Sequence, residues 1–268
     1  MSSGEQGVAL PYGFGDSITS VHLIQALNAS HVFNASYRRV YTEGLLDLIQ
    51  PILGFKRHQV EIDFESRYRP QEVMAELRRL TPYRVHDLKS VKVDRCFDFR
   101  QLIRSRPDLP GRYAVVSGAT LGRDRILAPE VWGKVSRSIA RAGVTPVLIG
   151  QDTPFRTTTF TYQYEADGID LRNCLSLQET INTLAHSEAC FCTANAVSVL
   201  AHELGCRTLC VGAWRARKAY LDRYFTGPAE MRINYNPSEY FTEAEVAVRD
   251  WLKNKRTELS IGGLLRLQ

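Results

Sequence analysis

Short apolar or β-branched runs alternate along this chain with longer stretches in which apolar residues recur at helical spacing. Such alternation is typical of βα units, which build a parallel sheet with helices packed on its faces. Strands are expected near residues 7–12, 31–36, 59–63, 112–119, 145–150, 188–194 and 207–213, and helices near 16–29, 42–53, 70–80, 129–142, 177–186, 196–204 and 242–257. The pattern therefore predicts an α/β protein.

One stretch without periodicity, RSRPDLPGRY at residues 104–113, interrupts this alternation just before the strongest strand signal. We place a domain boundary there, which gives a first domain of residues 1–108 and a second of residues 109–268. Each part has its own strands and helices, so the sequence predicts two Rossmann-like domains facing each other across a cleft. The helix expected near 242–257 is a candidate to pack back on the first domain.

The composition suits a folded, soluble protein with an anionic ligand. Of the 268 residues, 44% are hydrophobic, and 34 Lys and Arg against 29 Asp and Glu give a formal charge of +5. This charge is too small to indicate a nucleic-acid partner by itself. The N-terminus lacks the pattern of a signal peptide, and no run approaches the roughly 20 apolar residues of a membrane span.

The six cysteines form no C-x-x-C pair, so the sequence indicates neither a zinc knuckle nor a dithiol redox site. Cys190 and Cys192 alternate within an expected strand, which favours buried free thiols. Free thiols are typical of a reducing compartment, so the expected location is the cytoplasm.

The first turn that follows a strand reads GFGD, residues 13–16. Its glycines allow a tight bend and close backbone approach, but Ile18 stands where a dinucleotide fingerprint has its third glycine. Asp16 has two interpretations: an N-cap that accepts N–H bonds from Ile18 or Thr19, or a carboxylate held at the mouth of an active site. The spacing alone favours the cap.

Two later turns also carry polar groups beyond expected strands. The turn at residues 120–125 contains Arg123 and Arg125, which could clamp a diphosphate or lie in solvent with Asp124 as an ion-pair partner. The turn at 150–154 could present Gln151 and Asp152 to a base or ribose, although it also fits an ordinary turn.

The last two segments of interest flank the final expected strand. Residues 193–205 comprise a polar turn and a short apolar helix whose N-terminus faces the expected cleft, and His202 there is more typical of a structural histidine than a catalytic one. Residues 214–225 interleave aromatic residues with Arg215, Arg217 and Lys218. This basic segment fits a phosphate- or nucleic-acid-facing loop as well as a solvated amphipathic helix.

Three segments resemble the glycosyltransferase family that contains the lipopolysaccharide heptosyltransferases. GFGDSITSVHLIQAL (13–27) is similar to the family's first turn and helix. PEVWGKVSRSIARAGVTPVLIGQD (129–152) resembles the helix and strand that open its nucleotide-sugar domain, and residues 171–213 resemble its longest block. The resemblance implies a two-domain B-type glycosyltransferase fold, an inverting mechanism without a metal, and a nucleotide-diphosphate sugar as substrate rather than a cofactor.

The resemblance also implies roles for individual residues. Asp16 matches the aspartate that acts as general base on the acceptor hydroxyl, which favours catalysis over the cap. The predicted donor-binding residues are Gly15, Gly118, Thr120, Arg123, Arg125, Gln151, Asp152, Thr193, Asn195, Ala196 and Ser198, and the predicted acceptor or phosphate contacts are Arg215, Arg217 and Lys218. In one respect the chain differs: Ala194-Asn195-Ala196 stands where the family has Asp-Ser-Gly, and the histidine that follows there is absent.

The leading hypothesis is therefore an enzyme that moves a sugar from a nucleotide-diphosphate donor to a hydroxyl of a glycan or small molecule. The altered donor motif and the basic segment at 215–218 leave two alternatives open. One is transfer to hydroxymethylated bases of DNA, and the other is a nucleotide-sugar-binding module without turnover.

Overall fold

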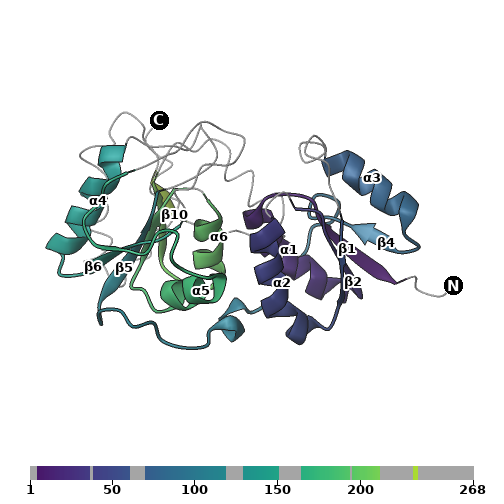
Figure 1. The fold of residues 1–268 in the computed structure, drawn as a ribbon, viewed down its shortest axis with the longest axis horizontal. Coiled ribbons are helices and arrows are strands. Elements are labelled where there is room, and N and C mark those ends of the chain that lie inside the picture. Colours follow the sequence, from purple (N-terminus) through teal and green to yellow (C-terminus); the bar gives the residue numbers. More distant parts are fainter. Residues whose placement is uncertain are drawn as a thin grey trace. The chain divides into compact units, whose positions relative to one another are not determined.

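The computed structural model describes residues 5–36, 39–60, 70–118, 129–150, 164–193, 195–211 and 232–234. Contacts divide the chain into two compact units, between Arg104 and Ser105. Each unit contains one parallel sheet with helices on both faces (Figure 1), which confirms the predicted α/β class. The predicted domain boundary lies slightly further along the chain, between residues 108 and 109.

The first unit is built on four parallel strands in the order β3-β2-β1-β4. The strands are β1 (Gln6–Leu10), β2 (His31–Asn34), β3 (Lys56–Gln59) and β4 (Arg84–His86), and the helices are α1 (Phe14–Ala26), α2 (Arg39–Leu53), α3 (Pro70–Leu80) and the short 3₁₀ helix η2 (Phe99–Leu102). The chain moves outward from β1 to β3 and then returns to place β4 on the other side of β1. Because such crossovers are right-handed, α1 and α2 cover one face and α3 the other (Figure 1).

Alternation of side chains along the strands explains the two cores of this unit. On one face, Ala9, Phe33 and Val85 from three neighbouring strands form a buried cluster with Met74 and Leu77 of α3. The residues between them in sequence face α1 and α2, and helix α1 has apolar side chains that are fully or almost fully buried, namely Ile18, Val21, Leu23 and Ile24. Burial on both faces accounts for the near-continuous apolar sequence of β1.

The second unit is built on six parallel strands in the order β10-β9-β8-β5-β6-β7. The strands are β5 (Tyr113–Ser117), β6 (Thr145–Leu148), β7 (Ile169–Asp170), β8 (Cys190–Cys192), β9 (Thr208–Val211) and β10 (Arg232–Asn234), and the helices are α4 (Pro129–Arg141), α5 (Leu177–Ala185) and α6 (Ala196–Glu203). Helix α4 covers one face, and α5 and α6 cover the other (Figure 1). The fully buried Trp132 of α4 and Phe191 of β8 belong to its core.

Most predicted elements are confirmed within a few residues, and the differences have physical causes. Strand β3 was expected at 59–63 but comprises Lys56–Gln59, a polar sequence that an edge strand tolerates. Strands β4, β7 and β10 were not predicted because each has only two or three residues and a single apolar one, whereas β8, also three residues long, is apolar throughout. Cys190 and Cys192 are buried free thiols, as predicted. The helix expected near 242–257 lies outside the described residues.

A row of hydrogen-bonded ionisable side chains, Glu5, His31 and His58, lies beside the α3 face of the first sheet. The Nδ1 of His31 is 2.7 Å from the Nε2 of His58, and the other ring nitrogen of His31 is 2.9 Å from Glu5 Oε2. The His31 ring also stacks on Tyr83 at a centroid distance of 3.8 Å. Burial, and then the charges of His31 and Lys56, lower the pKa of His58 from its ordinary value of 6.5.

This pKa shift predicts that acid destabilises the fold. Because the folded-state pKa of His58 lies below the unfolded value, its contribution to stability is complete above about pH 6.5 and is lost as the pH falls toward the folded pKa. We expect the free energy of unfolding, measured with urea, to decrease from pH 7 to pH 5. The free energy of unfolding of the His58→Gln variant should decrease less steeply over the same pH range. The pKa of His86 is also lowered, chiefly by burial, so some slope should remain. An identical slope in both proteins would contradict this prediction.

Candidate functional site

The strand order of the second sheet reverses between β5 and β8, since the chain leaves β5 toward β6 and later returns to its other side. In sheets of this kind, ligands bind beyond the carboxyl ends of the strands at that reversal. Ser117 ends β5 and is followed by Gly118, while Thr193 follows β8 and Asn195 precedes α6. The structure therefore brings Gly118, Thr193 and Asn195, three predicted donor-binding residues, to one place.

Asn195 connects the strand end to the helix at this point. Its side-chain oxygen accepts a hydrogen bond from the Ser198 N–H at 2.9 Å, which makes it the N-cap of α6. Its side-chain nitrogen donates to Ser117 Oγ at 3.1 Å. Among the described residues, the N–H groups of Ala196 and Val197 have no hydrogen-bond partner. The start of α6 thus offers two backbone donors at the positive end of a helix, an arrangement that suits an anion.

Ser198 and Thr193, two more of the predicted donor-binding residues, are both buried in this turn. Ser198 is fully buried, and its hydroxyl donates to the backbone oxygen of Asn195 at 2.7 Å. Thr193 is 1% exposed, and its N–H donates to the Ser117 backbone oxygen at 3.1 Å. Both residues hold the shape of the turn.

Gly118 occupies a position that has no room for a side chain. A Cβ there would lie 2.5 Å from Nε1 of Trp132, whose indole is fully buried. The Gly118 N–H donates to the phenol oxygen of Tyr164 at 3.1 Å, and the rings of Tyr164 and Trp132 pack 5.7 Å apart. The backbone at the end of β5 therefore lies directly against an aromatic platform.

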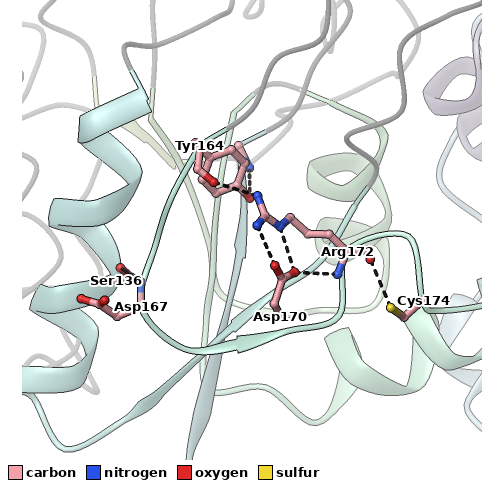
Figure 2. A network of polar contacts seen from close by, with 7 residues as sticks. Ser136, Tyr164, Asp167, Asp170, Arg172 and Cys174 are labelled. Carbon is pink, nitrogen blue, oxygen red and sulfur yellow. Dashed lines mark hydrogen bonds and ion pairs between the residues drawn. The ribbon is translucent and has the colours of Figure 1, made fainter.

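A polar network holds that platform from the edge of the sheet (Figure 2). Arg172 forms a fork with Asp170, with its Nε 2.9 Å and its Nη2 2.6 Å from the two carboxylate oxygens. The same guanidinium donates to the backbone oxygen of Tyr164 at 2.8 Å and lies 4.8 Å from the ring centroid. The hydrogen bonds from Arg172 lower the pKa of Asp170, although burial opposes the shift. Sequence reasoning missed Tyr164, Asp170 and Arg172; the only local signal was an Asp and an Arg two residues apart.

In the first unit, the structure rules out one of the two interpretations of Asp16, that it is the N-cap of α1. Helix α1 begins at Phe14, and its N-cap is Gly13 in an extended conformation (φ −75°, ψ 171°), without a side-chain cap. Asp16 is the third residue of the helix, so the interpretation as an N-cap is wrong. Its side chain is partly exposed, and a carboxylate in the first turn is stabilised by the positive end of the helix. Gly15 lies in the same turn.

A buried donor lies at the carboxyl edge of the same sheet. Asn34 ends β2 opposite Leu10 of β1 and is 3% exposed. Its Oδ1 accepts a hydrogen bond from the Ser36 N–H at 3.3 Å, but its Nδ2 has no hydrogen-bond partner among the described residues. Buried amide groups of this kind are usually satisfied, so Asn34 is a candidate to bind a water molecule or a ligand oxygen. No sequence pattern singled it out.

The remaining predicted site residues lie outside the described part of the chain and stay predictions. They are Thr120, Arg123, Arg125, Gln151, Asp152, Arg215, Arg217 and Lys218. Within the described residues, no group of three or more His, Cys, Asp or Glu side chains is arranged to hold a metal ion. No helix in the described ranges has the length and apolar character needed to cross a membrane.

No protein-family model and no curated protein sequence matches this chain. Solved structures do match. The dodecameric iron-containing heptosyltransferase TibC in complex with ADP-D-β-D-heptose is 12% identical, with 95% of this chain and 77% of that chain covered and a TM-score of 0.55. TibC from enterotoxigenic E. coli H10407 is 12% identical, with 94% and 76% covered and a TM-score of 0.54. The E. coli heptosyltransferase WaaC with ADP-2-deoxy-2-fluoro heptose is 16% identical, with 96% and 74% covered and a TM-score of 0.44.

The chain is thus a doubly wound α/β protein whose two sheets each have a strand-order reversal. It has the fold of the heptosyltransferase-like glycosyltransferases, as the three sequence segments predicted. At 12% identity, this likeness shows the fold and no more.

Proposed function

We propose that this protein is an inverting, metal-independent glycosyltransferase that moves a sugar from a nucleoside-diphosphate donor to a hydroxyl group of a glycan or small molecule. The observation that carries the proposal is the switch point of the second sheet. There, the start of α6 and the side-chain-free backbone at Gly118 lie at neighbouring strand ends, β8 and β5. Backbone donors at a helix N-terminus suit a diphosphate.

Asp16 is the proposed general base. It would accept the proton of the acceptor hydroxyl while the oxygen attacks the anomeric carbon from the side opposite the leaving diphosphate. Negative charge then grows on the departing phosphate, where the N–H groups at the start of α6 would stabilise it. No metal takes part in these steps.

The buried free thiols Cys190 and Cys192 support a reducing location, and we propose the cytoplasm.

The class of donor follows from the backbone N–H groups at the start of α6, which suit a diphosphate. ADP-heptose is the ligand in the TibC complex, so it heads the donor panel, followed by other ADP-sugars and by GDP- and UDP-sugars. A CMP-sugar, which carries one phosphate, is the negative control.

A thermal-shift titration over this panel tests the proposed function. A ligand that binds the folded state raises the midpoint of unfolding in proportion to the logarithm of its concentration, so one nucleotide-diphosphate sugar should do so. The released nucleoside diphosphate should then be detectable with water or an added sugar as acceptor. If no member of the panel shifts the midpoint, the assignment of the switch point to a donor fails.

Asn195→Ala gives a sharper test of where the donor binds. The variant loses the α6 cap and the bond to Ser117 Oγ, so we expect a loss of about 1 kcal/mol in stability and a lower affinity for the donor in calorimetry. Ser176→Ala is the matched control, because Ser176 caps α5 with a complete capping box. The control should lose similar stability and keep its affinity. Equal donor affinities in both variants would contradict a donor site at α6.

A further inference from the structure

The turn that carries Asp16 is flexible by composition yet anchored by its neighbours. Gly13 and Gly15 give it more backbone freedom than other residues would. A general base, however, has to be held within a fraction of an ångström of its productive position. The Gly13 backbone oxygen accepts bonds from the N–H and the hydroxyl of Ser17, at 3.0 and 3.2 Å. Ser17 Oγ in turn lies 3.2 Å from Thr42 Oγ1 of α2, which anchors the helical side of the turn.

The strand side of the turn is anchored through Tyr12, which lies between β1 and the N-cap of α1. Tyr12 is 8% exposed. Its hydroxyl donates to Asp87 Oδ2 at 2.5 Å, and its backbone oxygen accepts from Ser36 Oγ at 2.7 Å. Ser36 follows β2 and Asp87 follows β4, the two strands that flank β1. Tyr12, which follows β1, is therefore held by residues that follow the strands on both sides of β1.

Asp87 is held in place by Ser90 as well as by Tyr12. It is 5% exposed, its Oδ1 accepts from the Ser90 N–H at 3.0 Å, and its own N–H donates to Ser90 Oγ at 2.9 Å. The carboxylate thus presents its second oxygen to the phenol in one orientation. The ammonium of Lys89 lies 4.2 Å from the Tyr12 ring centroid and places a positive charge beside the pair.

A buried carboxylate–phenol pair adds little net stability to a core. Removing a carboxylate from water is costly, and apolar side chains of similar volume generally stabilise as well or better. The pair joins residues 75 positions apart and ends at the residue before the N-cap of the helix that carries Asp16. These two facts favour a role in orienting the turn.

We propose that Asp87, acting through Tyr12, is a positioning residue that holds Asp16 in its catalytic orientation. This inference rests on the proposed function, in which Asp16 is the general base. Loss of the phenol–carboxylate bond would free the strand side of a turn that contains two glycines. The base would then be misplaced in a fraction of the molecules, while the donor site in the second unit would be unchanged.

Tyr12→Phe tests the proposal, because it removes only the hydroxyl. The assay is release of nucleoside diphosphate from ADP-heptose or whichever nucleotide sugar of the panel binds. We expect kcat to fall between tenfold and a hundredfold, roughly the effect of a small misplacement of a catalytic group, with the KM for the donor unchanged. Tyr113→Phe is the matched control: it also loses a buried phenol bond, from Tyr113 to the Thr183 backbone oxygen at 2.7 Å, but at the other end of β5 from the donor site. It should lower the melting temperature without lowering kcat.

Asp87→Asn and Asp87→Ala supply a second comparison if Tyr12→Phe folds poorly. Asparagine keeps an oxygen that can accept the phenol proton, so Asp87→Asn should retain most of kcat, and Asp87→Ala should lose as much as Tyr12→Phe. Equal kcat in Tyr12→Phe and Tyr113→Phe, or in Asp87→Asn and Asp87→Ala, would overturn the positioning role. Asp16→Asn in the same assay separates the failures. If Asp16→Asn is inactive while the two variants of either pair have equal kcat, only the positioning role is lost. If Asp16→Asn keeps full turnover, the role of Asp16 as base fails as well.

Discussion

Asp16→Asn is expected to abolish sugar transfer while leaving donor binding nearly unchanged. The amide has the size of the carboxylate but cannot accept the proton of the attacking hydroxyl, and removal of a general base typically lowers the rate by about a hundred- to ten-thousandfold. Since Asp16 is the third residue of α1 and not its cap, the substitution removes no capping bond. The rate loss should therefore come without a comparable loss in melting temperature.

The measurement is turnover of the nucleotide sugar together with calorimetric donor affinity for the same protein samples. Asp98→Asn is a suitable control, because it removes a carboxylate charge in the first unit at an exposed position, the cap of η2. The control should keep full turnover. Wild-type turnover in Asp16→Asn would show that this carboxylate only stabilises the first turn of its helix.

Gly118→Ala is expected to have the second-largest effect, on both stability and donor binding. The added methyl group would lie 2.5 to 2.8 Å from three atoms of the Trp132 indole, closer than carbon atoms approach. Trp132 is fully buried in the core of the second unit, so either the indole or the end of β5 has to move. Overpacking of this kind costs about 1–3 kcal/mol and occasionally more.

Gly111→Ala is the control for this substitution, since a Cβ at Gly111 meets nothing within 4 Å. It should leave stability unchanged or slightly raised, because alanine restricts the unfolded chain. Urea unfolding measures the stability of both variants, and calorimetry measures their donor affinity. The combination Gly118→Ala with Trp132→Phe should lose less than the sum of the single losses, because the smaller ring gives the methyl group room. Strict additivity would contradict a direct clash.

The elements that could be predicted from sequence are those with long apolar periodicity or clear end signals. Helix α4 begins at Pro129 and α6 begins at Ala196, both as the sequence indicated. The Lys56–Gln59 strand could not be predicted at its true position, because its polar side chains lack the alternation of a half-buried strand and its place at the sheet edge is set by pairing with β2.

The candidate site was predictable only where a turn follows a strand. Asp16 and Asn195 each carried such a signal, whereas Gly118 fell within an expected strand and was named only through the resemblance. The partners that hold them are distant in sequence: Tyr164 is 46 positions from Gly118, and Asp87 is 75 positions from Tyr12. Contacts of that kind depend on strand order, which a single sequence does not specify.

An inverting glycosyltransferase cleaves its nucleotide-diphosphate sugar by attack from the face opposite the leaving group, and we propose this reaction for this chain. Proton NMR of the reaction with the donor that binds tests it most directly, with water as acceptor and early time points that precede mutarotation. We expect release of the nucleoside diphosphate and of free sugar with the anomeric configuration opposite to that of the donor, with both absent in Asp16→Asn. Retained configuration, or cleavage that persists in Asp16→Asn, would contradict it.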